Sequence, residues 1–133
     1  MADRIEGRVR ELLEAKNFGD VATIARDGTP HPAVVWVDTD GEDVLLNSSE
    51  GRVWPENLRR DPRAAVTVAN LENPYEYVTI KGRTVQITPE GADEHIDALA
   101  KKYLGKDEYP SRRPGEVRLI VRIRPERVRL RGG

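Results

Sequence analysis

The chain contains no cysteine among its 133 residues. That absence excludes disulfide bonds, thiolate metal sites and a cysteine nucleophile. The only two histidines, His31 and His95, form no recognisable metal-binding set with the scattered carboxylates. No serine lies in the Gly-x-Ser-x-Gly context of a nucleophile elbow, so a Ser-His-Asp hydrolase has no support either.

Neither sign of charge dominates the chain, because 22 Lys and Arg residues stand against 23 Asp and Glu residues, for a net charge of -1. This balance gives no general attraction to nucleic acid or to an anionic membrane. No apolar run approaches the roughly 20 residues that span a bilayer, and the charged N-terminal stretch is unlike a signal peptide. We therefore expect one soluble cytoplasmic domain over residues 1–133, with no nucleic-acid or membrane partner.

Two segments show the spacing of amphipathic helices. Residues 3–16 form the first, and Asp3 is placed to cap its start. Residues 89–104 form the second, and Pro89 suits its first turn. The apolar faces consist of Ile5, Val9, Leu12 and Leu13 in the first helix and of Ile96, Leu99, Ala100 and Tyr103 in the second. His95 lies in a polar stretch of the second helix, so we expect it to face solvent.

The remaining apolar runs have the spacing of strands. Residues 20–26 and 31–38 are joined by Asp27-Gly28-Thr29-Pro30, a strong hairpin signal because glycine accepts the positive φ of the turn. A second turn leads into residues 44–48, which predicts three consecutive antiparallel strands. Later strands are expected at 63–70, 75–88 and 117–130. About six mostly antiparallel strands with two or three helices predict an α+β fold around a small barrel.

The last predicted strand alternates apolar residues with Arg118, Arg122 and Arg124. Such arginines could form a nucleic-acid-binding face. The pattern is more typical of the solvated side of a half-buried strand, where the charges also protect a sheet edge. We favour the solvated edge.

Residues 45–66, LLNSSEGRVWPENLRRDPRAAV, place several donors between two strands. They include the hydroxyls of Ser48 and Ser49, backbone N–H groups near Gly51, and the cation of Arg52. Free N–H groups at a helix start together with an arginine suit a phosphate or another anion. Serines before a helix are more often caps, and the spacing of a P-loop is absent. The residues alone leave both interpretations open.

Pro55 restricts Trp54 to extended conformations, so the linker helix is expected to begin at Pro55. It runs through Leu58 to Arg60, and Asp61-Pro62 ends it.

Six stretches carry a resemblance to a known family: ATIARDGTPH, VWVDTDGEDVLLN, GRVWPENLRRDPR, NPYEYVTIKGR, GADEHIDALAKKYLG and RIRPERVR. Together they span nearly the whole chain in order. They resemble the pyridoxamine 5′-phosphate oxidase-like split β-barrel superfamily and, more narrowly, the small actinobacterial coenzyme F420-dependent oxidoreductases. Relatives in this superfamily bind FMN, F420, haem or nothing.

The resemblance implies a flavin or deazaflavin in a groove between the two subunits of a homodimer. Its phosphate would lie at the end of the third strand and the start of the next helix, and its ring along the second strand. Three later side chains would approach from across the groove. The implied residues are Asn47, Ser48, Ser49, Arg52, Val53 and Asn57 for the phosphate, Pro32, Val34, Val35 and Trp36 for the ring, and Tyr75, Tyr77 and Lys81 across the groove.

Many F420-type relatives have a lysine where this chain has Trp54. The indole either packs on the cofactor ring or an apolar substrate, or it fills the groove and weakens cofactor binding. We predict that Trp54→Lys tightens F420 binding in a fluorescence titration, because it restores a charge-assisted contact. Weaker binding in that variant would support ring stacking instead.

The resemblance implies an oxidoreductase that passes a hydride from reduced F420 to an unsaturated or carbonyl-conjugated small molecule. No catalytic acid or base is named, since the chemistry belongs to the cofactor. Two alternatives remain: an FMN-binding oxidase or flavin reductase of the same fold, and a non-catalytic carrier of F420, FMN or haem.

Overall fold

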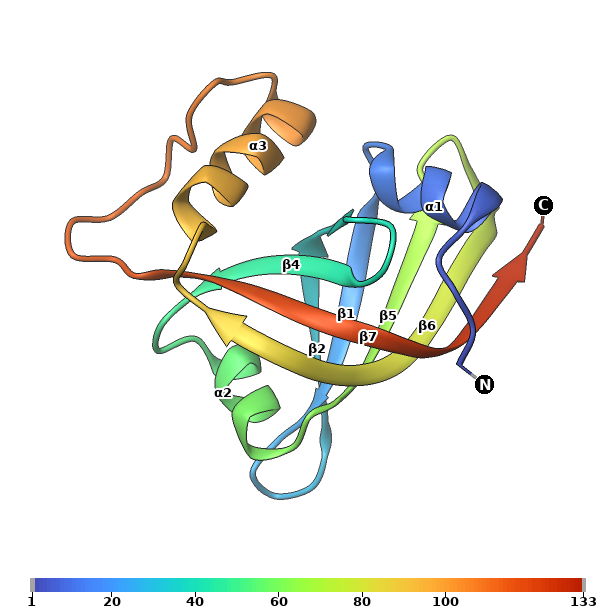
Figure 1. Ribbon diagram of the computed structural model, residues 1–133, viewed down its shortest axis with the longest axis horizontal. Helices are drawn as coiled ribbons and strands as arrows, with labels where there is room; N and C mark the ends of the chain where they lie inside the picture. The colour runs from blue at the N-terminus through green and yellow to red at the C-terminus, as the bar shows by residue number, and fades with distance from the viewer. Residues whose placement is uncertain (1, 133) are drawn as a thin grey trace.

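The computed structural model describes residues 2–132, which form three helices and seven strands (Figure 1). In chain order these are α1 Gly7–Glu14, β1 Phe18–Ile24, β2 Pro30–Trp36, β3 Asp38–Thr39, β4 Val44–Ser49, α2 Val53–Arg60, β5 Arg63–Asn70, β6 Asn73–Thr88, α3 Ala92–Leu104 and β7 Arg118–Arg131. No helix within residues 2–132 is long and apolar enough to cross a membrane.

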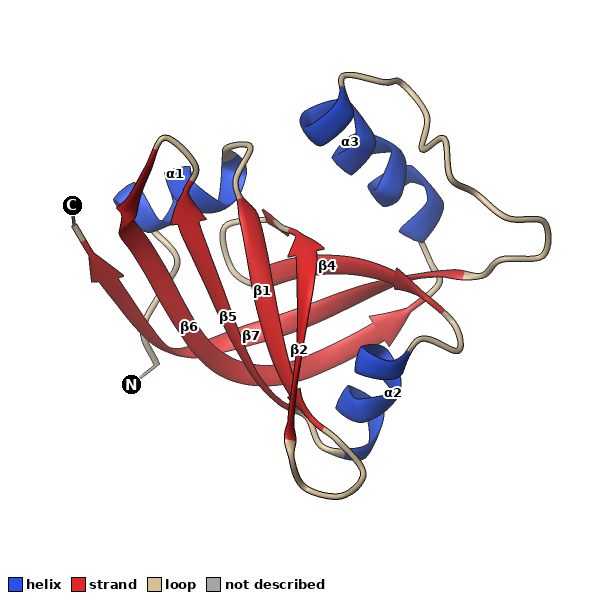
Figure 2. Cartoon of the chain, turned by 180° about the vertical axis from the view of Figure 1, so that it is seen from behind, coloured by secondary structure: helices blue, strands red, loops and turns tan. Residues whose placement is uncertain are grey.

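The seven strands form one antiparallel sheet in the order β2-β1-β5-β6-β7-β4-β3. The long strands β6 and β7 curve across the molecule, and the sheet curls into an open half-barrel (Figures 1 and 2). The predicted α+β split β-barrel is thereby confirmed, with one short strand more than expected. Gly82 lies at an irregularity in the β6–β7 pairing, where a side chain would collide with the backbone carbonyl of Arg124.

The predicted hairpin is present, with Phe18 opposite Trp36 and Ile24 opposite Pro30. The expectation that residues 44–48 continue this meander is wrong, because β4 pairs with β7 and β3 at the far side of the sheet. Almost every residue of β4 is buried, so the strand needs cover on both faces. Because β4 does not pair with β2, β2 is an edge strand of the sheet.

The buried core lies inside the curl of the sheet. The concave side chains of the strands pack against one face of α1, which closes one end of the barrel. A smaller cluster lies under α3 and contains the predicted face residues Ile96, Leu99 and Tyr103. Burying each such side chain contributes about 1.5–3 kcal/mol.

The helix starts differ from the expected ones. Asp3 does not cap α1, because its carboxylate accepts the backbone N–H of Val128 (2.9 Å), which ties the N-terminal segment to β7. The linker helix α2 begins at Val53 rather than Pro55. Proline is tolerated at its third position because backbone N–H groups of a first turn have no helical acceptor in any case. Helix α3 begins at Ala92, after the αL residue Gly91.

The arginines of β7 do not mark a solvated edge, because β7 lies between β6 and β4. Arg118 is buried. Arg122 donates to Asp40 (2.6 Å), and the Arg124 guanidinium lies 3.3 Å from Asp43, so acids of the 38–43 turn neutralise both side chains. The edge prediction failed because strand order is not encoded in the alternation of one strand.

Helix α3 is held to the barrel by two adjacent side chains. The Tyr103 hydroxyl donates to the carbonyl of Asn17 (2.5 Å) and accepts the N–H of Val37 (3.0 Å). The Lys102 amine donates to the carbonyls of Leu13 (2.8 Å) and Val37 (2.6 Å). A neutral amine has two N–H donors, one for each of these two carbonyls.

The buried contacts of Lys102 and Tyr103 should make the free energy of unfolding depend on pH. Burial lowers the pKa of Lys102 from 10.5 to about 8. Between these values the unfolded chain keeps a proton that the folded chain has released, so the free energy of unfolding should rise with pH. Burial raises the pKa of Tyr103 from 10.0 to about 12, which acts in the opposite direction only above about pH 10.

Urea unfolding of the native protein and of Lys102→Met between about pH 7.5 and 9.5 tests this. The native protein should gain stability with pH relative to the variant. Equal slopes for the two proteins would show that Lys102 keeps its ordinary pKa.

Candidate functional site

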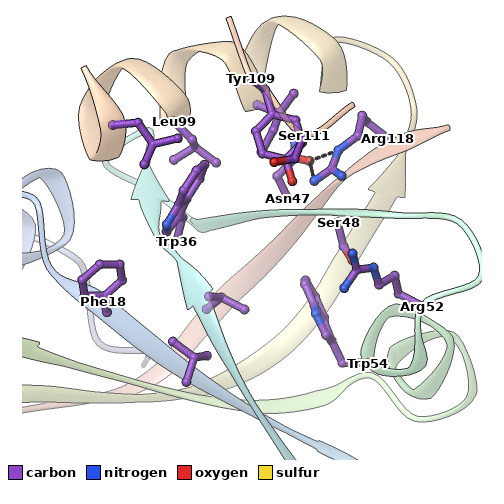
Figure 3. A pocket seen from close by; sticks show the side chains of 14 residues that line it. Phe18, Trp36, Asn47, Ser48, Arg52, Trp54, Leu99, Tyr109, Ser111 and Arg118 are labelled. Atoms are coloured by element: carbon purple, nitrogen blue, oxygen red, sulfur yellow. Dashed lines mark hydrogen bonds between the residues drawn. The ribbon is translucent and has the colours of Figure 1, made fainter. Parts of the chain in front are cut away.

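A cleft of about 460 Å³ lies where α3, the β1–β2 hairpin and the β4–α2 junction meet (Figure 3). This volume falls within the range of small-molecule sites. Its lining residues are Phe18, Val34, Val35, Trp36, Asn47, Ser48, Arg52, Trp54, Ile96, Leu99, Leu104, Tyr109, Ser111 and Arg118.

One end of the cleft is polar and cationic. Gly51 turns the chain from β4 into α2 with φ +89°, a conformation that glycine adopts without strain. Arg52 follows as the N-cap residue of α2, and its exposed guanidinium has no ion pair or hydrogen bond within residues 2–132. The Ser48 hydroxyl has no hydrogen-bond partner among the described residues either. With the free N–H groups of the first turn of α2, these donors suit an anionic group.

The opposite side of the cleft is aromatic and apolar. Trp36 stacks on Tyr103, with ring centroids 5.1 Å apart and planes 6° from parallel. Tyr109 meets Trp36 edge-on, with centroids 6.0 Å apart. Val34 beside them is 73% exposed. A flat apolar wall of this kind suits the face of a planar ring.

Trp54 belongs both to the cleft and to the core. Its side chain is only 8% exposed, and it packs in the same buried cluster as Leu58 and Val35. In Figure 3 it lies on the α2 side of the cleft, near Arg52. The indole therefore forms a wall, and the cleft stays open beside it.

Asn47 of β4 forms hydrogen bonds to the start of α3 and to β7. Its Oδ1 accepts from Nε (3.0 Å) and Nη2 (2.8 Å) of Arg118, and its Nδ2 donates to the carbonyl of Ala92 (3.0 Å). The same nitrogen lies 3.1 Å from Nδ1 of His95. Arg118 also pairs with Glu116. The amide of Asn47 is thus occupied by the protein, and it positions α3 and β7 along the cleft.

The expectation that His95 faces solvent is wrong. Its side chain is 9% exposed, and its Nε2 lies 3.3 Å from Oδ2 of Asp38, outside hydrogen-bond alignment. The first turns of α3 pack on β4, which turns His95 inward, whereas Asp93 and Glu94 of the same stretch stay exposed. No group of three or more His, Asp or Glu residues in the described part of the chain is arranged to hold a metal ion.

Comparison with known proteins places this architecture in a family. The sequence model of a family described as pyridoxamine 5′-phosphate oxidase matches residues 5–132. The chain belongs to that family. The superfamily resemblance found in the sequence is confirmed.

Solved structures of similar proteins share the fold of this family member. A protein described as an F420 reductase is 28% identical, with 90% of this chain and 94% of that chain covered and a TM-score of 0.79. A conserved hypothetical protein from Mycobacterium tuberculosis is 24% identical (98% and 88% covered, TM-score 0.75). A structure described as a candidate pyridoxamine 5′-phosphate oxidase from Listeria innocua is 20% identical (92% of this chain and 94% of that chain covered, TM-score 0.69). The last two likenesses show the fold alone.

The structure brings together about half of the residues that the resemblance implied for the family's cofactor. Val34, Val35, Trp36, Asn47, Ser48, Arg52 and Trp54 all line the cleft. Ser49 lies in an adjoining groove that shares Arg52. Asn57 is buried within α2, where it donates to Thr23 (3.0 Å) and accepts from Arg60 (2.8 Å), and it does not line the cleft. Pro32 and Val53 are exposed and lie outside the cleft.

Tyr75, Tyr77 and Lys81 do not reach the cleft of their own chain. All three are exposed on β6, and Tyr75 is 81% exposed. Tyr77 and Lys81 stand opposite Arg131 and Arg127 of β7. A role for them at the site of this family member requires a second copy of the chain.

Seven residues of the cleft were not predicted as site residues from the sequence: Phe18, Ile96, Leu99, Leu104, Tyr109, Ser111 and Arg118. The α3 residues have an apolar spacing that indicates core packing only. Tyr109 and Ser111 lie in a loop with no periodic signal. Nothing local in the sequence marks these positions as cleft residues.

Proposed function

We propose that this protein binds coenzyme F420 in the cleft and passes a hydride from its reduced form to an unsaturated small molecule in the cytoplasm. The observation that carries the proposal is the pairing of one free guanidinium, Arg52, with the aromatic wall of Trp36 across a single cleft. The 28% identical structure described as an F420 reductase supports the same assignment.

The donor set fits such a cofactor. Arg52, the Ser48 hydroxyl and the free N–H groups of α2 would hold a phosphate, because each offers a donor without a protein partner. Val34 and Trp36 offer a flat apolar surface to a tricyclic ring. FMN also combines a ring with a phosphate, so it is the alternative ligand of the same site.

The cofactor when bound supplies the hydride and its two electrons. The chain's own residues bind and orient the cofactor, and they exclude water from it. Arg52 and Ser48 would fix the anionic end, and Trp36, held by its stack on Tyr103, would fix the plane of the ring. Residues of helix α3 and of the loop over residues 105–117 line one side of the cleft and would limit the access of water to a bound ring there.

A homodimer is part of the proposal. β2 is a free edge of the sheet, and its exposed Val34 lies at the mouth of the cleft. In the proposed dimer, Tyr75, Tyr77 and Lys81 of the second copy approach the ring side of the site. Light scattering of the purified protein would give the mass of the assembly, and a monomer at working concentration would exclude this arrangement.

A fluorescence titration of cofactor-free protein with F420, and in parallel with FMN, tests the function. Both tryptophans of the chain line the cleft, so their emission reports directly on its occupancy. We expect micromolar or tighter binding of F420 and weaker binding of FMN. A preference for FMN would identify a flavin enzyme, and binding of neither would refute a flavin-type site.

A further inference from the structure

Tyr109 is held on three sides at the aromatic end of the cleft. Its ring meets Trp36 edge-on at 6.0 Å, and the guanidinium carbon of Arg118 lies 5.1 Å from the ring centroid. Its backbone N–H donates to Asp97 of α3 (2.9 Å). Figure 3 draws it on the α3 side, beside the Asn47–Arg118 pair. A loop residue anchored in this way is pre-organised, so its hydroxyl occupies a defined place.

The hydroxyl of Tyr109 makes no hydrogen bond within the described residues. Tyr103 differs, because its hydroxyl is bonded to the backbone of Asn17. The hydroxyl is not among the buried polar atoms without a partner, so it is accessible from outside the protein. An anchored ring with a free, accessible hydroxyl at the edge of a cleft can donate to a bound ligand.

The other polar groups of the cleft are engaged elsewhere. Asn47 is bonded to Arg118 and to the carbonyl of Ala92, Arg118 also pairs with Glu116, and Arg52 and Ser48 lie at the α2 end. Ser111 is exposed, and its side chain has no hydrogen bond or ring contact within residues 2–132 to hold it. Among the described lining residues, Tyr109 is therefore the anchored residue in contact with Trp36 whose hydroxyl is left free.

We propose that the Tyr109 hydroxyl donates a hydrogen bond to the carbonyl oxygen of the substrate and makes the site selective for carbonyl-conjugated acceptors over plain alkenes. This inference rests on the proposed function. When a hydride adds to the carbon β to a carbonyl, the π electrons of the C=C bond move toward the oxygen. A donor fixed at that oxygen stabilises the developing charge. A solvent proton at the α-carbon then completes the two-electron reduction.

A binding experiment without turnover tests the donor. Fluorine NMR titrations of the cofactor-free protein with 4′-fluoroacetophenone and with 4-fluoro-α-methylstyrene compare a ketone with an alkene of almost the same shape. We expect the ketone to bind about threefold to tenfold more tightly, the net effect of one neutral hydrogen bond. Tyr109→Phe keeps the ring and should abolish the preference. Glu108→Gln, an exposed neighbour on the same loop, should keep it.

A turnover experiment gives the second readout. With reduced F420 and a planar aromatic enone, Tyr109→Phe should lower kcat about tenfold to a hundredfold and change KM less, because the contact strengthens as charge develops. An unchanged kcat, a ketone preference that survives in Tyr109→Phe, or no preference in the native protein would overturn the proposal. Failure of the proposed function is seen separately, as absence of F420 binding in the native protein.

Discussion

Arg52→Ala is expected to weaken F420 binding at least tenfold and leave the fold intact. The guanidinium is exposed, faces the cleft and has no ion pair or hydrogen bond within residues 2–132, so its removal disturbs no internal contact. A charge-assisted hydrogen bond to a phosphate contributes about 1.5–3 kcal/mol, which corresponds to about tenfold to a hundredfold in the dissociation constant. The measurement is a tryptophan fluorescence titration with F420, together with a thermal unfolding scan.

Arg26→Ala provides the matched control. Arg26 is also an exposed arginine without a hydrogen bond or ion pair among the described residues, but it lies in the β1–β2 turn outside the cleft. The Arg26→Ala variant should bind F420 like the native protein. If Arg52→Ala binds as tightly as Arg26→Ala does, the phosphate is held elsewhere and the polar end of the cleft has been assigned wrongly.

Trp54→Ala is expected to lower the free energy of unfolding by about 3–5 kcal/mol, the usual cost of truncating a large buried aromatic side chain. The indole is 8% exposed and packs with Leu58 in the core, so its loss leaves a cavity that α2 fills only partly. Urea denaturation measures the change. Val53→Ala on the same turn removes a side chain that is 57% exposed and should cost well under 1 kcal/mol.

A small change in Trp54→Ala, close to that of Val53→Ala, would mean that the indole contributes little to the core and is free for a ligand. The burial of Trp54 also bears on Trp54→Lys. A lysine at this position loses core packing and must carry its ammonium group to the cleft. Its F420 affinity is therefore interpretable only on protein shown to be folded by the same denaturation curve.

The sequence by itself determined the local elements and the cationic linker. The Asp27-Gly28 turn between two apolar runs specifies the β1–β2 hairpin, because residues that are neighbours in the chain set both the turn and the register. The spacing of Ile96, Leu99 and Tyr103 specifies the buried face of α3 for the same reason. Ser48 and Arg52 could be identified as donors from the sequence alone, since a strand end and a helix start lie only a few residues apart.

Only the tertiary structure decided which distant residues meet. Asn47 and Arg118 are 71 positions apart, and their contact depends on β4 leaving the first hairpin to pair with β7. The same strand order buries Arg118, turns His95 inward and brings Tyr109 against Trp36. Local periodicity carries no record of strand order, because the same alternation fits an edge or a central strand. The donors at the α2 end of the cleft could therefore be named from the sequence, whereas its aromatic and α3 walls, including Tyr109, could not.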